Sequence, residues 1–196
     1  MTHISNTDLD NPYRRLHTKV LIIIDMQNDF IDGSLGTAEA FAIVPNVRKK
    51  VEEAVRNGDM IIYTRDTHFE NYLETTEGKK LPVKHCIIGT KGWQIPDELL
   101  PNSDVFYYIH DKYTFGSTRL PMYIYELNDE CFDIDEIELV GLCTDICVVS
   151  NALLLKSYFC NICEVSVDAT CCAGVTPETH EAALKTMEMC QINIKR

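Results

Sequence analysis

The sequence lacks any apolar run that approaches the roughly 20 residues of a membrane-spanning helix. Its first 19 residues are polar and hold no apolar stretch of the kind found in a secretory signal, so we expect a cytoplasmic protein. Basic residues are also few, because 18 lysines and arginines stand against 30 acidic residues and give a net charge of −12. This negative field repels phosphate backbones, which argues against nucleic acid and favours a small-molecule partner.

Two common signatures are missing as well. There is no G-x-S-x-G motif for a nucleophilic serine, and no glycine-rich phosphate loop of the required form. Cysteine is plentiful, with nine residues, an odd number. Without a secretory signal, this usage indicates reduced thiols rather than a disulfide framework, and most of them are expected to be small buried side chains.

Apolar strands and amphipathic helices alternate along the chain, which predicts an α/β fold. We expect a three-layer α/β/α arrangement around a mostly parallel, Rossmann-like sheet of five to six strands. The predicted strands are 19–27, 60–66, 104–112, 136–142 and 161–170, with 192–194 as a sixth; the predicted helices are 44–57, 118–128, 144–160 and 177–190. One domain over 18–196 is expected, with residues 1–17 as an N-terminal arm and 67–103 as a long, functional loop.

Reactive side chains follow four of the predicted strands. Asp25 ends the first strand, Asp66 the second and Lys112 the third, while Cys143 and Cys147 follow the fourth. Because the carboxyl ends of parallel strands share one edge, where ligands bind, these side chains are expected to lie together. Each alone has a structural explanation, such as a turn cap or a solvated lysine. Their convergence on one edge indicates a catalytic site.

Cys147 is the candidate nucleophile of this cluster. Thr144 is predicted to cap a helix whose first turn holds Cys147, where the free N–H groups and the dipole favour a thiolate. Asp25 could then accept the thiol proton, Lys112 could stabilise the charges, and backbone N–H groups over 143–147 could bind an oxyanion. The alternative is a redox pair, but the spacing is C-x-x-x-C rather than the C-x-x-C of thioredoxin-like sites.

The loop after the second strand offers a metal site. Asp66, His68 and His85 supply one carboxylate and two imidazoles, a set that suits Zn, Fe or Mn with open positions. Three acidic residues lie between the histidines and could add a fourth ligand: Glu70, Glu74 and Glu77. The alternative is a polar surface loop that binds nothing.

Five segments together resemble the isochorismatase-like cysteine hydrolases, and among them most closely the nicotinamidases (pyrazinamidases). The segments are "LIIIDMQNDF", "TRDTH", "LPVKHC", "DKYTFGST" and "VGLCTDICV", and they occur in the family's order over residues 18–196. The T-D-x-C-V block is specific to the superfamily. The D-x-H and H-C pair narrows the resemblance to nicotinamidases.

The resemblance implies a role for each matching residue. Asp25, Lys112 and Cys147 correspond to the catalytic residues, and a cis peptide is implied at Leu142–Cys143, with the N–H groups of Cys143 and Cys147 as oxyanion donors. The implied metal ligands are Asp66, His68 and His85, completed by Glu77 or, as the alternative, Glu74. Phe30 corresponds to an aromatic pocket residue, and Leu81 stands where the family often has another.

The resemblance therefore implies a metal-dependent cysteine amidohydrolase that converts nicotinamide to nicotinate and ammonia through a cysteine thioester, in NAD salvage. One divalent ion is expected, with zinc preferred over iron or manganese, and a homo-oligomer is expected because the family often self-associates. One alternative is a related hydrolase acting on another small amide, a ureide or an N-carbamoyl compound. Another is a thiol redox or non-catalytic binding protein.

Overall fold

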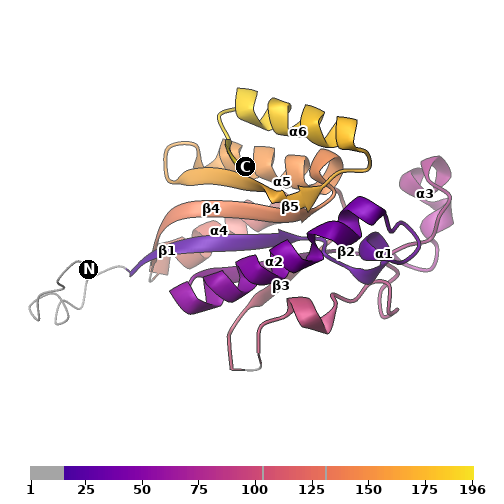
Figure 1. The fold of residues 1–196 in the computed structure, drawn as a ribbon, viewed down its shortest axis with the longest axis horizontal. Coiled ribbons are helices and arrows are strands. Elements are labelled where there is room, and N and C mark those ends of the chain that lie inside the picture. The colour runs from indigo at the N-terminus through magenta and orange to yellow at the C-terminus, as the bar shows by residue number, and fades with distance from the viewer. Residues whose placement is uncertain (1–15, 103, 131) are drawn as a thin grey trace, which may run out of the picture.

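The protein is described by a computed structural model that covers residues 16–102, 104–130 and 132–196 (Figure 1). Its centre is a six-stranded sheet in the order β3-β2-β1-β4-β5-β6, in which every neighbouring pair is parallel. The strands are β1 Leu16–Ile24, β2 Met60–Asp66, β3 Tyr108–Lys112, β4 Phe132–Leu142, β5 Glu164–Ala173 and β6 Asn193–Lys195. The predicted fold class is confirmed, including the sixth strand. The predicted arm over 1–17 lies outside the described residues, apart from the two that begin β1.

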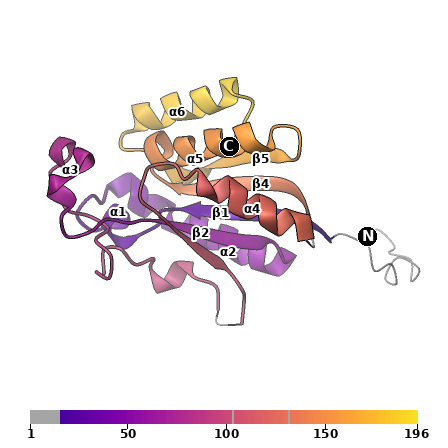
Figure 2. The same cartoon turned by 180° about the vertical axis from the view of Figure 1, so that it is seen from behind.

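Helices cover both faces of the sheet, which makes the three predicted layers. One face carries α2, and its core contains the β1 residues Leu21 and Ile23. The opposite face carries α4, α5 and α6, and its core contains Val20, Ile22 and Ile24 (Figure 2). The helices are α1 Asn28–Ile31, α2 Ala38–Asn57, α3 Thr76–Lys80, α4 Arg119–Glu130, α5 Val149–Phe159 and α6 Pro177–Met189. This alternation of buried side chains along β1 explains its continuous apolar sequence.

Helix ends are set by local side-chain chemistry. Thr37 caps α2 by accepting a hydrogen bond from the Ala40 N–H, so α2 begins at Ala38, earlier than predicted, and contains Pro45. Gly58 ends α2 in the left-handed conformation at φ 74°. Thr176 caps α6. Among the described residues, no helix is long and apolar enough to cross a membrane.

A network of ion pairs lies between the sheet and α2, away from the side chains at the strand ends. Glu138 on β4 is fully buried, and its two carboxylate oxygens lie 2.5 Å from Lys19 Nζ and 2.8 Å from Lys195 Nζ. Lys50 on α2 adds a third ammonium at 3.6 Å and also pairs with Asp168 at 2.5 Å. Glu138 therefore joins three strands and one helix, while Glu136 also pairs with Lys19 at 3.4 Å and with Lys195.

Replacing Glu138 by glutamine is expected to lower the free energy of unfolding by about 3 kcal/mol, because it leaves partly buried ammonium groups without their central counter-ion. Urea denaturation would measure this change. The matched control is Glu52→Gln, which breaks an exposed pair with Arg48 on α2 at 3.2 Å. This control should cost less than about 1 kcal/mol. Equal losses in the two variants would contradict the expectation.

Candidate active site

Three side chains predicted from the strand ends meet around one buried ammonium group. Lys112 Nζ lies 2.6 Å from Asp25 Oδ2, 3.3 Å from Asp66 Oδ1 and 3.5 Å from Cys147 Sγ. All four residues are buried, with Asp25 and the Lys112 side chain fully excluded from solvent. The sheet order explains the meeting, because β3, β2 and β1 are adjacent and end at Lys112, at Asp66 and directly before Asp25, and Cys147 follows the next strand, β4. An acid, a cation and a thiol in contact can carry out nucleophilic chemistry.

Asp25 is held in an unusual backbone conformation. Its φ is 47°, in the left-handed region that a non-glycine residue adopts at some cost in free energy. Thr64 on the neighbouring strand fixes this turn, since its hydroxyl donates to Asp25 Oδ1 at 2.6 Å and accepts from the Asp25 N–H at 3.2 Å. The carboxylate is therefore oriented by Thr64 on one oxygen and by Lys112 on the other.

Cys147 lies in a single π-helical turn, Thr144–Val148, that precedes α5. The prediction that Thr144 is the helix cap is wrong, because Cys143 is the N-cap residue, whereas Cys147 does lie in the first turn of this helical segment. The Thr144 hydroxyl instead pairs with His180 Nδ1 at 2.8 Å, and the turn has no side-chain cap. Two amides of the turn, those of Ile146 and Val148, donate to the Cys143 carbonyl. The implied cis peptide is present at Leu142–Cys143.

The charges at the site leave the Cys147 thiol protonated. Burial raises its pKa well above the ordinary value, and Asp25 raises it further, which outweighs the opposing effect of Lys112. Burial also raises the pKa of Asp25 although Lys112 lowers it, and the surrounding negative groups raise the pKa of Lys112 although burial opposes its charge. A thiol that is protonated at rest, beside a carboxylate, agrees with the expectation that Asp25 could accept its proton.

Alkylation of Cys147 by iodoacetamide is expected to be slow at about pH 7 and to go on accelerating beyond about pH 9, because only the thiolate reacts and the pKa of this thiol lies well above the roughly 8.5 of an ordinary one. Mass spectrometry of the peptide that contains Cys147 would give the rate at each pH. The exposed Cys190 provides an internal reference in the same sample. A rate for Cys147 that levels off below about pH 7 would instead indicate a resting ion pair with Lys112.

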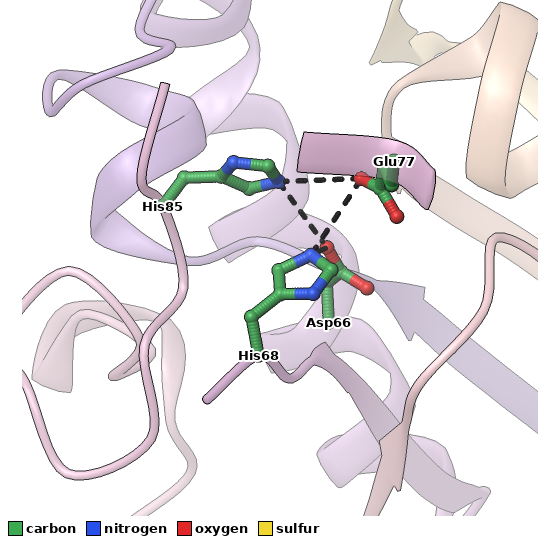
Figure 3. Close-up of side chains that lie close together, drawn as sticks. All are labelled: Asp66, His68, Glu77 and His85. Carbon is green, nitrogen blue, oxygen red and sulfur yellow. Dashed lines mark hydrogen bonds and ion pairs between the residues drawn. The ribbon is translucent and has the colours of Figure 1, made fainter. Parts of the chain in front are cut away.

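A second cluster lies beside the first and offers four metal-binding groups (Figure 3). One ligand atom from each of Asp66, His68, Glu77 and His85 lies within 4.8 Å of the others. His68 Nε2 is 2.9 Å from Asp66 Oδ2, and His85 Nε2 is 3.6 Å from the same oxygen. Two imidazoles and two carboxylates that converge in this way suit a divalent transition-metal ion.

The orientation of these groups fits such an ion. His85 Nδ1 lies 2.9 Å from the Val83 carbonyl oxygen, which accepts its hydrogen and leaves Nε2 with a lone pair directed at the cluster. Burial acts to raise the pKa of Asp66, but its contacts with the two histidines and the charge of Lys112 outweigh burial and lower that pKa. Asp66 is therefore an anion, as a metal ligand must be. The edge of the Tyr72 ring packs against both imidazoles.

Of the two glutamates considered as a fourth ligand, Glu77 is the one that joins the cluster. Its Oε1 lies 3.6 Å from His68 Nε2 and 3.8 Å from His85 Nε2, whereas Glu74 is exposed and outside the group. Thr75 caps α3 through the Gly78 N–H, and a Cβ at Gly78 would stand 2.1 Å from the Tyr72 carbonyl oxygen. Glycine thus allows α3 to pack closely enough for Glu77 to reach the histidines.

A cavity of about 640 Å³ opens onto both clusters. Asp66, Glu77, His85 and Cys147 lie in its wall, together with the two predicted pocket residues, Phe30 and Leu81. The rest of the wall is mainly apolar and includes Tyr113, Phe115 and Ile146. Its size and its apolar lining with a few convergent polar groups are typical of small-molecule sites.

Two buried amide side chains support the site and were not predicted. Asn151 donates to the carbonyl oxygens of Cys147 at 2.8 Å and Phe115 at 3.1 Å, and it accepts from the Ser117 N–H at 2.9 Å. It thus ties the turn that carries Cys147 to the loop that lines the cavity. Gln27 contacts the backbone of Asp66. Two features of the sequence could have indicated these roles. Asn151 is a polar residue within an apolar helix, and Gln27 is a polar residue close after a buried strand.

Residues 19–194 match the family model for the isochorismatase domain. A Bacillus subtilis relative described as an uncharacterized isochorismatase family protein PncA is 32% identical over 69% of this chain and 76% of its own length. A probable inactive nicotinamidase of Arabidopsis thaliana is 30% identical over 92% of both chains. The nicotinamidase of Saccharomyces cerevisiae is 26% identical over 69% of this chain and 80% of its own.

Solved structures share the fold. A pyrazinamidase/nicotinamidase of Streptococcus mutans superposes with a TM-score of 0.76 at 28% identity, over 90% of this chain and 99% of that one. An N-carbamoylsarcosine amidase of Thermoplasma acidophilum gives 0.72 at 25%, over 91% and 96%. A pyrazinamidase of Pyrococcus horikoshii in complex with zinc gives 0.74 at 24%, over 91% and 98%, which supports the fold alone.

Proposed function

The chain belongs to the isochorismatase family of hydrolases, and from that premise we propose that it hydrolyses nicotinamide to nicotinate and ammonia. The observation that carries the proposal is the contact between two clusters in one cavity. The Asp25–Lys112–Cys147 group supplies a base, a cation and a nucleophile, while the Asp66–His68–Glu77–His85 group supplies a metal site. Lys112 contacts Asp25 of the first group and Asp66 of the second, so the two groups are adjacent. A ligand bound at the metal site would therefore lie close to Cys147.

The cavity is suited to a flat aromatic amide. Phe30 packs near the His85 ring, with centroids 5.5 Å apart, and Phe115 and Leu81 add apolar wall. We assign Asp66, His68, Glu77 and His85 as the residues that would hold a divalent ion, with zinc preferred for two nitrogen and two oxygen donors. When bound, such an ion supplies a Lewis-acid contact for a ring nitrogen.

The protein's own residues suffice for the covalent steps. Cys147 Sγ bonds to the carboxamide carbon as its proton passes to Asp25, and the carbonyl oxygen takes the negative charge next to the Cys143 and Cys147 amides. Asp25 then returns the proton to the nitrogen as the C–N bond breaks, which releases ammonia and leaves a thioester. Water attacks the thioester while Asp25 takes one of its protons. The C–S bond then breaks as Asp25 returns that proton to Cys147 Sγ, and the released acid loses its own proton to solvent as nicotinate.

Lys112 has an electrostatic role in these steps. Its ammonium lies between Asp25 and Cys147, so it favours the transient thiolate and limits the rise in the Asp25 pKa that burial causes. Asp25 can therefore exchange a proton with the thiol rather than hold it permanently. The Arabidopsis relative is described as probably inactive, so membership alone does not establish turnover. The presence of all three groups in contact supports an active enzyme.

The test is ammonia release from nicotinamide and pyrazinamide by purified protein, before and after treatment with a chelator. Activity that is lost on chelation and restored by added zinc, iron or manganese is the expected result. Protein that carries a metal ion but is inactive on both amides would overturn the substrate assignment.

The second candidate is hydrolysis of another small amide, a ureide or an N-carbamoyl compound, favoured by the fold shared with the N-carbamoylsarcosine amidase. Metal analysis separates the two candidates. A protein that contains no metal ion, keeps its activity with chelator and acts on N-carbamoyl substrates would favour the second.

A further inference from the structure

Gln27 extends the contact between two strands beyond the point where their main chains pair. The main chain of β1 pairs with β2 as far as Ile23 and Tyr63, and β1 ends at Ile24. Asp66 lies three residues beyond Tyr63, at the end of β2. The Gln27 side chain takes the place of a peptide group there, since its Oε1 accepts from the Asp66 N–H at 2.7 Å and its Nε2 donates to the Asp66 carbonyl at 2.9 Å.

From this contact we infer that Gln27 is a positioning residue for the metal centre, an inference that rests on the metal site of the proposed function. Gln27 is fully buried, and its hydrogen bonds to Asp66 are made with the main chain of that ligand residue rather than with its carboxylate. Fixing both polar groups of the Asp66 backbone sets where the Asp66 carboxylate projects. Supporting groups of this kind commonly change metal affinity by about 10- to 100-fold.

A carboxamide is the side chain that this position requires. One end must accept a hydrogen from an N–H, and the other must donate to two carbonyl oxygens, those of Asp66 at 2.9 Å and Trp93 at 2.8 Å. Glutamate cannot donate, and methionine of similar length can do neither. The Trp93 contact also joins Asp66 to the loop that follows His85.

The same short segment holds the other side of the centre. Asp29 Oδ2 accepts from the Cys86 N–H at 2.7 Å, directly after His85, where the Cys86 φ is 47°. Residues 27 and 29 thus fix the backbone at Asp66 and beside His85, while Asn28 between them does not. Asn28 Nδ2 instead donates to the carbonyl oxygens of Lys91 and Gln94 in the same loop. Asn28 therefore serves as the matched control for Gln27, because the two residues are adjacent but only Gln27 contacts a ligand residue.

The test compares Gln27→Met with Asn28→Ala, each as the full chain. Zinc affinity is measured by competition with a chelating dye, and the visible spectrum of the Co²⁺-loaded protein reports the ligand field. Gln27→Met is expected to bind zinc about 10- to 100-fold more weakly with a changed cobalt spectrum. Asn28→Ala also loses two loop contacts, so its thermal stability should fall while its zinc affinity and cobalt spectrum stay those of the wild type.

The outcomes separate this inference from the proposed function. A wild-type protein that binds zinc and a folded Gln27→Met that binds it equally well would overturn the positioning role alone. A wild type that binds neither zinc nor cobalt would overturn the metal centre itself, whatever the variants do. If Gln27→Met does not fold, Gln27→Asn replaces it, since its amide is one methylene too short to keep all three hydrogen bonds and should weaken zinc binding.

Discussion

Replacing Cys147 by alanine is expected to abolish amide hydrolysis, with a loss in kcat on the order of 10⁴-fold or more, because no covalent intermediate can form. Lys112 cannot replace this nucleophile, because its ammonium is paired with two carboxylates. The protein should stay folded, since alanine replaces a small side chain. Ammonia release with saturating nicotinamide measures the loss.

Cys143→Ala is the matched control for this variant. Cys143 is half-buried and also lines the cavity, but its assigned contribution is a backbone N–H that alanine keeps. We expect it to retain most of the wild-type activity. The assignment of the nucleophile is overturned if Cys143→Ala is inactive and Cys147→Ala is active. Substantial activity in both single variants would remove the covalent mechanism altogether.

Replacing Lys112 by methionine is expected to have the second large effect, this time on stability as well as on activity. Lys112 is the ammonium that both Asp25 and Asp66 contact, at 2.6 and 3.3 Å, inside a site closed to solvent. Removing one partner of a buried ion pair commonly costs about 3 to 5 kcal/mol, because the remaining charge stays desolvated. We expect a loss of this size in the free energy of unfolding of metal-free protein, together with loss of activity.

Chemical denaturation of three proteins tests this explanation. Lys112→Met should be strongly destabilised, and the double variant Asp25→Asn with Lys112→Met should regain part of the loss, because one unpaired carboxylate is gone. Lys84→Met removes an exposed pair with Glu70 at 2.9 Å and should cost less than about 1 kcal/mol. A double variant no more stable than Lys112→Met would show that the cost arises from packing rather than from the unpaired charge.

The meeting of Asp25, Lys112 and Cys147 could be predicted because each residue follows a strand that the sequence indicates. Apolar runs that stop at Asp25, Asp66 and Lys112 place these side chains at one sheet edge in any parallel α/β fold. The protonation of Cys147 could not be predicted. Burial and the charge of Asp25 raise the pKa of that thiol, and both result from the tertiary fold. The predicted Thr144 cap is also absent, since Thr144 pairs with His180, which lies 36 residues away.

The metal group was predicted less completely, for a related reason. Asp66 and His68 are two residues apart and His85 belongs to the same loop, so the sequence alone indicates them. The choice between Glu74 and Glu77 depends on how α3 packs against Tyr72, which Gly78 permits. The supporting roles of Thr64, Gln27 and Asn151 rest on contacts with residues 34 to 66 positions away, and no local pattern encodes them.

The sequence by itself determined the α/β class, the identity of the reactive residues and their place at the strand ends, since alternation and apolar runs follow from local burial. Tertiary structure alone decided the electrostatics. Desolvation and the mutual approach of Asp25, Lys112 and Cys147 set their charges, and these depend on distances of a few ångströms between distant segments. Periodicity reports which side of an element is buried, but it carries no information about which buried groups will touch.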